Sequence, residues 1–387
     1  MPMTKQILYE EITFPEIASL PRDIPFILPL GYGYDLNQIN SILGDPDRII
    51  FLPPFPFGWN NSGLEVAEIL LGKYILNLIQ SLHDDGFSRV FALTPQGINL
   101  NIGSNQICLP NSSQWNKTSF LPSSLEIGKV ILIPIGHTEQ HSYHLPMATD
   151  TLIIDAIAKG TANSIANLCS TLPVMPYGVS THRSSFCGTL NTGGRVFEDF
   201  WLDIIRVLVS RGFDRFYFIN GHGGNGSFLV NIIKYAGEKF RRIFCATASL
   251  YLSGPDGSAI IEKYRESKIG GMGHACELET SIILHLRPDL VHMERVRDDT
   301  DFITTPSYYM DWMEGGALIA NPPWDDDTIH GAYGSGSLGT AEKGKIWLEA
   351  AIAEKITHIN EINEQQRRRE DRRNSGFGLW GKQFKSE

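Results

Sequence analysis

The strongest chemical signal in the sequence is a run of acids and histidines, IGHTEQHSYHLPMATD, at residues 135–150. It holds two acids and three histidines, which are Glu139, Asp150, His137, His141 and His144. Carboxylate oxygens and imidazole nitrogens are ligands for Zn²⁺, Mn²⁺ and Fe²⁺, and an Asp set apart from a Glu-x-His pair can bridge two ions. The alternative, a polar loop with helix-capping residues, does not call for so many histidines. The run therefore predicts a metal centre.

A second candidate is the glycine-rich turn FINGHGGNG at residues 218–226, which carries His222 and Asn225. Its glycines permit positive φ angles and a close approach of the backbone, as a turn packed on a metal ion or a substrate requires. Such a turn before a helix could instead cradle a phosphate on backbone amides. No Lys-Ser/Thr pair follows it, so we favour the metal or substrate role.

A third candidate, GGMGHACELETS at residues 270–281, places His274, Glu277 and Glu279 at the start of a predicted helix. Acids in a first turn also interact favourably with the helix dipole, so one glutamate could have that role alone. A His ahead of two acids, after another glycine turn, favours participation in the same site.

Alternating apolar runs and amphipathic stretches from about residue 129 predict the elements that position these residues. This pattern is typical of a three-layer αβα domain with a mostly parallel sheet, in which ligands bind at the carboxyl ends of the strands. The predicted strands are residues 130–134, 171–176, 215–219 and 243–249, and the predicted helices are residues 150–168, 196–211, 227–240, 276–286 and 341–366.

The first 115 residues predict a smaller α/β unit that resembles a degenerate copy of the same pattern. PFILPLGYGYD (25–35) parallels VILIPIGHTEQH (130–141), and HDDGFSRVFALTPQG (83–97) parallels VSRGFDRFYFINGHGG (209–224). GYGYD and TPQG stand where the chemical residues would be, so this copy is predicted to be structural. Chance likeness between two strand-turn-helix segments is the alternative.

These observations predict four regions in the chain. They are an N-terminal unit (1–115), a linker (116–126) rich in Asn, Ser and Pro, a metal-dependent hydrolase domain (127–366) and a charged C-terminal tail (367–387).

The composition predicts a soluble cytoplasmic protein that binds neither nucleic acid nor membranes. The net charge is -10, and the charged run Arg367–Arg373 is interrupted by acids and reads as a solvated helix end. The five cysteines form no CxxC pair, which favours reduced thiols. Residues 1–20 carry acids where a signal peptide needs an apolar run, and no stretch is apolar for the roughly 18 residues of a membrane span.

Five motifs in fixed order resemble the creatininase (creatinine amidohydrolase) family over about residues 125–365. They are EQHxxHLPxxTD (139–150), NGHGGN (220–225), HAxExETS (274–281), RPDLV (287–291) and AEKG (341–344). The resemblance implies a parallel sheet between helices, two divalent metal ions, a homo-oligomer, and hydrolysis of a cyclic or linear amide by a metal-activated hydroxide.

The resemblance also implies roles for individual residues. Glu139 and His222 would hold one ion, His141 the other, and Asp150 would bridge them. In creatininase itself a Glu after the NGH turn is a ligand, whereas two glycines follow here. Glu277 is therefore expected to supply the missing carboxylate, with Glu279 as the alternative and as a candidate catalytic acid. His274 is expected to protonate the leaving nitrogen, and an outer-layer role is its alternative.

Departures from the family pattern bear on the substrate. Tyr251 and Gly270 occupy the places of the tryptophans that close on creatinine, so creatinine is not the expected substrate. Arg183, preceded by His182, stands where the family commonly has a His, and an Arg there could bind a carboxylate or lie on the surface. The candidate substrate-binding residues are therefore Arg183, His182, Tyr251 and Asn225.

The sequence thus predicts a metal-dependent amidohydrolase that acts on a small-molecule or short-peptide amide. One alternative is a family peptidase of the mycofactocin-maturation type. A second is a catalytically silent binding or structural subunit, but buried acids are costly without a function.

Overall fold

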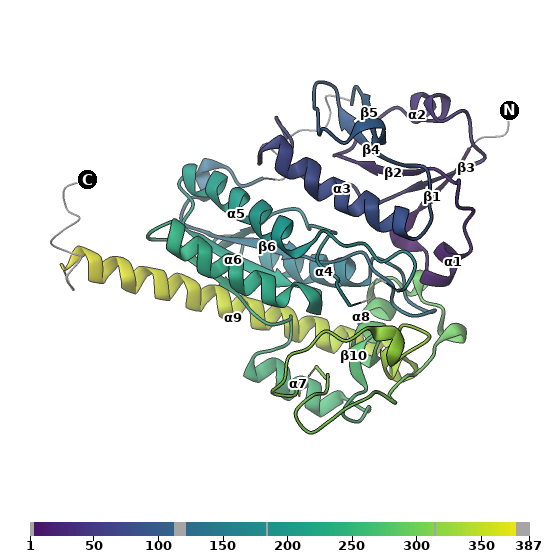
Figure 1. The fold of residues 1–387 in the computed structure, drawn as a ribbon. Coiled ribbons are helices and arrows are strands. Elements are labelled where there is room, and N and C mark those ends of the chain that lie inside the picture. Colours follow the sequence, from purple (N-terminus) through teal and green to yellow (C-terminus); the bar gives the residue numbers. More distant parts are fainter. Residues whose placement is uncertain (1–3, 112–120, 183–184, 313–314, 377–387) are drawn as a thin grey trace.

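The structure, a computed structural model, describes residues 4–111, 121–182, 185–312 and 315–376. Two parallel sheets, one from each half of the chain, lie on either side of a layer of helices (Figure 1). Within these residues, no helix combines the length and apolar character needed to cross a bilayer.

The N-terminal unit contains a five-stranded parallel sheet in the order β1-β3-β2-β4-β5. The strands are β1 (Lys5–Leu8), β2 (Phe26–Pro29), β3 (Arg48–Phe51), β4 (Val90–Pro95) and β5 (Gln106–Leu109). The helices are α1 (Phe14–Ala18), α2 (Leu36–Ile42) and α3 (Glu68–Asp84).

The second sheet is also parallel, in the order β7-β6-β8-β9, with an antiparallel pair β10-β11 beside it. The strands are β6 (Val130–Ile135), β7 (Cys169–Thr171), β8 (Arg215–Asn220), β9 (Phe244–Thr247), β10 (Met272–His274) and β11 (Tyr333–Gly334). The helices are α4 (Thr149–Ser164), α5 (Gly194–Ser210), α6 (Gly226–Lys239), α7 (Pro255–Tyr264), α8 (Glu277–Leu286) and α9 (Ala341–Asn374).

The two sheets share a topology, which bears on the predicted repeat. Omitting the edge strand β1, the order β3-β2-β4-β5 repeats as β7-β6-β8-β9, and α2 and α3 occupy the connections that α4 and α5 occupy in the second sheet. This correspondence supports the interpretation of the N-terminal unit as a second copy of the pattern. The predicted region boundaries remain predictions, although α9 continues through residues 367–374 of the predicted tail.

Strand alternation divides the core into two faces. Along β6, Ile131, Ile133 and Ile135 face the cluster shared with α3 and α5, whereas Val130 and Leu132 face the cluster of α4, α8 and α9. Successive side chains of a strand point to opposite faces, so a fully apolar strand must be covered on both. The expected mostly parallel sheet between helical layers is confirmed.

The N-terminal unit packs on the second sheet through α3, which lies against α5 (Figure 1). One continuous buried cluster runs from the N-terminal strands through both helices to β6 and β8. The core of the N-terminal unit is therefore continuous with that of the second.

The predicted elements match the structure best where the hydrophobic pattern extends over many residues. All five predicted helices of the second half are present, whereas α7 was not predicted. The strand predicted at residues 171–176 shares only Thr171 with β7. Residues 172–176 lie beyond the end of β7 but keep contact with β6 through a 2.9 Å hydrogen bond from Leu172 N to Leu132 O and a bridge between Ile135 and Met175. The loops that matter for the site begin at such strand ends.

Candidate metal centre

The predicted metal residues meet at the carboxyl ends of β6 and β8. Ile135 and Asn220 are partners in the parallel ladder, so the loops after the two strands leave the sheet side by side. The first loop carries Glu139 and His141 and ends in the first turn of α4, which holds Asp150. The second loop carries His222.

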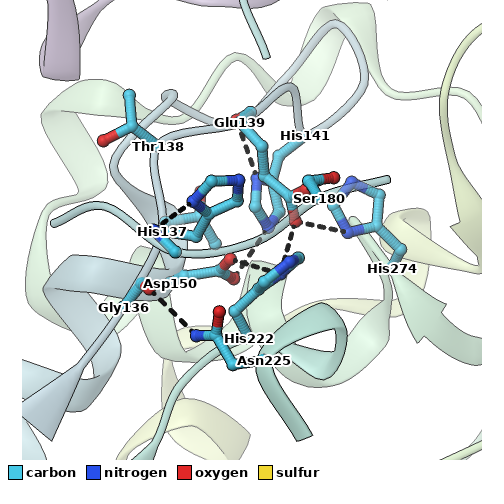
Figure 2. Close-up of polar contacts among 12 residues, drawn as sticks. Gly136, His137, Thr138, Glu139, His141, Asp150, Ser180, His222, Asn225 and His274 are labelled. Carbon is cyan, nitrogen blue, oxygen red and sulfur yellow. Dashed lines mark hydrogen bonds and ion pairs between the residues drawn. The ribbon is translucent and has the colours of Figure 1, made fainter. Parts of the chain in front are cut away.

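Short distances join four of these side chains, all of them buried (Figure 2). His222 Nδ1 lies 2.9 Å from Glu139 Oε1 and 3.1 Å from Asp150 Oδ2. The other Asp150 oxygen, Oδ1, lies 3.1 Å from His141 Nε2. Asp150 thus presents one oxygen to each histidine, which is the arrangement of a bridging carboxylate.

His274 joins the same cluster from β10. Its Nδ1 lies 3.8 Å from Glu139 Oε1, and its ring centroid lies 4.1 Å from that of His141. Ser180 Oγ donates to Glu139 Oε2 at 3.2 Å (Figure 2). Neither contact could be located from the local sequence, because His274 and Ser180 come from distant parts of the chain.

In His222, His141 and His274, the ring nitrogen that faces away from the cluster, here called the outer nitrogen, lies beside a backbone carbonyl. His222 Nε2 lies 3.0 Å from Val179 O, His141 Nδ1 3.2 Å from Glu139 O, and His274 Nε2 2.7 Å from Gln140 O. Each outer nitrogen must carry its proton to donate to a carbonyl, so the inner nitrogen of each neutral ring has a lone pair toward the cluster. Metal-ligating histidines are usually oriented in this way.

His137 is oriented differently, although it lies beside the cluster with its ring centroid 4.4 Å from that of His222. Its Nδ1 accepts from Gly178 N at 2.9 Å, so the proton of the neutral ring is on Nε2. This tautomer has no second lone pair for an ion. The structure therefore favours His222 over His137 as the donor on this side.

The donor set fits divalent metal ions. Ligand atoms lie within 4.8 Å of one another in three groups: His137, Glu139 and His222; Glu139, His141 and His274; and His141, Asp150 and Glu279. All these residues are buried, and buried carboxylates are stable only when they are paired with cations or bound to metals. The first two groups share Glu139 and the last two share His141, and their oxygen and nitrogen donors suit a pair of ions.

The charges of the cluster are strongly coupled. Burial alone would lower the pKa of His222, but Glu139 and Asp150 raise that pKa to about 9. Burial likewise opposes the protonation of His141, and Asp150 reverses the effect and raises its pKa. The carboxylates thus stabilise positive charge at the positions that face the cluster.

The two glutamates at the start of α8 point in different directions. Glu277 accepts from Lys343 Nζ at 2.7 Å and from the backbone N–H groups of Glu266 and Ser267, at 3.0 and 2.8 Å. Glu279 Oε1 lies 3.9 Å from His141 Nε2, and its Oε2 accepts from Cys276 N at 3.3 Å. Against the expectation for Glu277, this geometry favours Glu279 as the fifth ligand. Residues two apart on a helix point about 200° apart, so only one of them faces the cluster.

The predicted substrate residue Asn225 has a positioning role instead. Its Oδ1 accepts from Val179 N at 2.9 Å, and its Nδ2 lies 3.3 Å from both Gly136 O and Asn220 Oδ1. The side chain is fully buried and ties together the three loops of the site. This geometry favours loop positioning over the predicted substrate binding for Asn225.

The other predicted substrate residues are distributed around the site. The ring of His182 stacks on that of His222, with 6.4 Å between the ring centroids, and lines the cavity that opens onto the cluster. Tyr251 is buried against Trp312, with a ring distance of 4.7 Å, and its hydroxyl has no hydrogen-bond partner among the described residues. Arg183 lies outside the described residues, so its role remains a prediction.

The glycines of the 218–226 turn allow close packing and do not adopt the expected positive φ angles. A Cβ on Gly224 would lie 2.3 Å from Val179 O, and one on Gly221 would lie 2.8 Å from Asp150 O. Neither has a positive φ angle. The positive φ angles at the site belong instead to Ser142 and Ala275, each directly after a histidine of the cluster.

The N-terminal unit contacts described residues of the loop after Pro176 (177–182 and 185–193), which include Ser180 and His182. Asn77 Nδ2 donates to Thr192 O at 2.6 Å, and Ser81 Oγ accepts from Asn191 N at 3.1 Å. Asp85 Oδ2 accepts from Gly188 N at 2.6 Å. The N-terminal unit therefore positions one wall of the site from α3 and the residue that follows it.

Asp85 gives this contact a pH dependence. Burial raises the pKa of Asp85 to about 6. Between about pH 4 and pH 6 the folded state therefore binds more protons than the unfolded state, and stability falls as the pH rises. We expect Asp85→Asn to remove up to roughly 2 kcal/mol of this fall, because the Asn Oδ1 can still accept from Gly188 N. Urea unfolding of both proteins at pH 4, 5, 6 and 7 measures it, and parallel pH profiles would contradict it.

A cavity of about 750 Å³ opens onto the cluster. It is lined by Glu139, Asp150, His222, His274 and Glu279 on the polar side. Trp312 and Trp324 also line it, and the sequence analysis missed both. The regions of Tyr251 and Gly270 indeed contain no Trp, but residues 299–332 bring two into the site.

Comparison with known proteins places residues 117–359 within a family model described as "Creatininase: Creatinine amidohydrolase". Creatinine amidohydrolase of Pseudomonas putida is 29% identical over 236 residues, 58% of this chain and 85% of that protein. A mycofactocin precursor peptide peptidase of Mycobacterium ulcerans (strain Agy99) is 32% identical over 173 residues, 43% of this chain and 62% of that protein.

A solved structure titled "Creatininase Mn" superimposes with a TM-score of 0.51 and 26% identity. It covers 62% of this chain and 92% of the solved chain. The similarity thus spans the second sheet and the metal cluster.

Proposed function

This chain belongs to the creatininase family of metal-dependent amidohydrolases, and we propose that its buried cluster binds two divalent ions and hydrolyses a C–N amide bond. The observation that carries the proposal is Asp150, whose two carboxylate oxygens face His222 and His141 at 3.1 Å each. One binding position would be completed by Glu139 and His222, and the other by His141 and Glu279. Zn²⁺ and Mn²⁺, together with Fe²⁺, suit this donor set.

When bound, the ions would supply an activated water and polarise the amide oxygen. The protein's own residues would do the rest. His274, held at Nε2 by Gln140 O, has the lone pair of Nδ1 directed into the cluster. This nitrogen would take a proton from the attacking water and pass it to the leaving nitrogen. Ser180, through its hydrogen bond, would hold Glu139 in orientation.

A second candidate, a peptidase, is favoured by the size of the cavity. About 750 Å³ lies within the range of roughly 300–1,000 Å³ typical of drug-sized ligands and exceeds what a single small lactam fills. A short peptide or modified peptide would use this space. Release of amine from lactams, formamides and short peptides, each with and without added metal, separates the two candidates.

The neighbouring glutamates of α8 provide a matched test of the ligand set. We expect Glu279→Gln to lower metal affinity by about tenfold or more, because it removes a charge that faces His141. Glu277→Gln should retain the metal and lose roughly 2 kcal/mol of stability, because Lys343 loses a buried partner. Metal content and urea unfolding of both variants measure these effects. Loss of metal from Glu277→Gln alone would reverse the assignment.

We further propose that the protein is a cytoplasmic homo-oligomer. This expectation rests on the family resemblance and on the composition. Sedimentation of the purified full-length chain tests its assembly state.

A further inference from the structure

A long irregular loop contributes much of the cavity lining. It lies between Asp299, which forms a bridge with Gly334, and Tyr333 in β11. Its described residues contain no α-helix and only one short 3-10 helix, Trp324–Asp326. Irregular loops of this length in compact domains are usually functional.

The loop brings aromatic rings close to the proposed metal centre. The Trp324 ring lies 5.3 Å from His274, nearly edge-to-face at 75°, and 4.9 Å from His182. Trp312 is tied to β10 by a 2.7 Å hydrogen bond from its backbone N to Met272 O, and its ring packs on Tyr251. Trp324 therefore lies beside the residue proposed as the proton donor.

The cavity away from the metal cluster is largely apolar. Its other lining residues include Phe228, Tyr308, Met310 and Ile319. Among the described residues that line it, none is Lys or Arg, and the one acid outside the cluster, Asp311, is bound by Arg265 through two 2.6 Å contacts. Away from the metal cluster, the described lining therefore offers no Lys or Arg to a charged substrate group.

We propose that the described residues of this loop, 299–312 and 315–333, recognise a flat, neutral, apolar ring of the substrate. The protein would thus act on amides whose scissile nitrogen or carbonyl is attached within a few bonds to an aromatic ring. This inference rests on the proposed function, because it takes the metal cluster as the reacting end of the cavity. Aromatic rings pair favourably with indole faces and edges, whereas a saturated ring offers only its surface area.

The test compares two amides that differ only in the ring, acetanilide and N-cyclohexylacetamide. Binding to the full-length, Mn²⁺-loaded protein is measured by isothermal titration calorimetry. We expect acetanilide to bind roughly threefold to tenfold more tightly. Trp324→Leu should reduce this preference to about one, and Trp324→Phe should retain most of it.

Tyr235→Leu is the matched control, because it removes an exposed aromatic ring on α6, outside the cavity. Its preference should equal that of the unmodified protein. Equal binding of the two amides, or an unchanged preference in a folded Trp324→Leu variant, would overturn the proposal. Metal content and amide hydrolysis are measured on the same samples. If the unmodified protein binds metal and hydrolyses amides but shows no ring preference, this inference alone is refuted. A metal-free, inactive unmodified protein refutes the proposed function.

Discussion

Replacing Glu139 with Gln is expected to remove at least one metal ion and to lower amide hydrolysis by about a thousandfold or more. The carboxylate faces His222 at 2.9 Å and His274 at 3.8 Å, so it contributes to more than one group of donors. The amide has the same shape but no negative charge to stabilise a cation, and loss of several kcal/mol of transition-state stabilisation gives an effect of this order.

His222→Ala should have a similar effect, because it removes the nitrogen donor of the same position. Elemental analysis of the purified variants measures the loss of metal. Steady-state rates with any lactam, formamide or peptide that the unmodified protein hydrolyses measure the loss of activity. His144→Ala is the control. This histidine is also buried on the 136–150 loop, but its Nε2 lies 2.9 Å from Thr280 Oγ1 and it belongs to none of the three donor groups. Full metal content in both Glu139→Gln and His222→Ala would refute the proposed site.

Trp201→Ala is expected to lower the free energy of unfolding by about 3–5 kcal/mol. This fully buried ring on α5 makes edge-to-face contacts with Phe57 of the N-terminal unit at 6.0 Å and with Phe218 of β8 at 5.5 Å. The substitution would leave a cavity between the two halves of the chain, and a tightly packed core closes such a cavity only in part.

Because Trp201 belongs to one buried cluster that spans both sheets, we expect both units to unfold in a single transition at lower urea concentration. Far-ultraviolet circular dichroism and tyrosine fluorescence follow the transition. Leu76→Ala, at a partly exposed position of α3, should change the stability by less than about 0.5 kcal/mol. Two separate transitions, with only one shifted by Trp201→Ala, would show that the units are energetically independent.

The N-terminal unit illustrates how a region without chemical residues can still shape a site. The GYGYD segment follows β2, and the TPQG segment begins with the last two residues of β4. These strands are the topological counterparts of β6 and β8. They lack the acid and histidine ligands, yet α3 from the same unit holds the loop that carries Ser180 and His182. We infer that the unit acts on the site by positioning this loop.

The sequence by itself determined the kind of chemistry and the general architecture. Ligand types and spacing are local properties, so Glu139, His141 and Asp150 could be grouped from one short loop. His222 could be added because parallel strands end at a common edge. Periods of two and of 3.6 residues likewise depend only on nearby residues, so the central strands and long helices were predicted close to their observed bounds. Short elements have weak periodicity, so the strand β7 was predicted at a displaced position and the helix α7 was missed.

Only the tertiary structure decided which side chains face one another across long separations. The packing of α8 against α9 distinguished Glu279 from Glu277. It places the Glu277 carboxylate beside Lys343 of α9, on the side of α8 away from the cluster. Asn225 became a positioning residue because its partners come from three separate loops, and Trp324 entered the site from a loop without regular structure. Such contacts depend on how elements pack in space, which the order of residues along the chain does not specify locally.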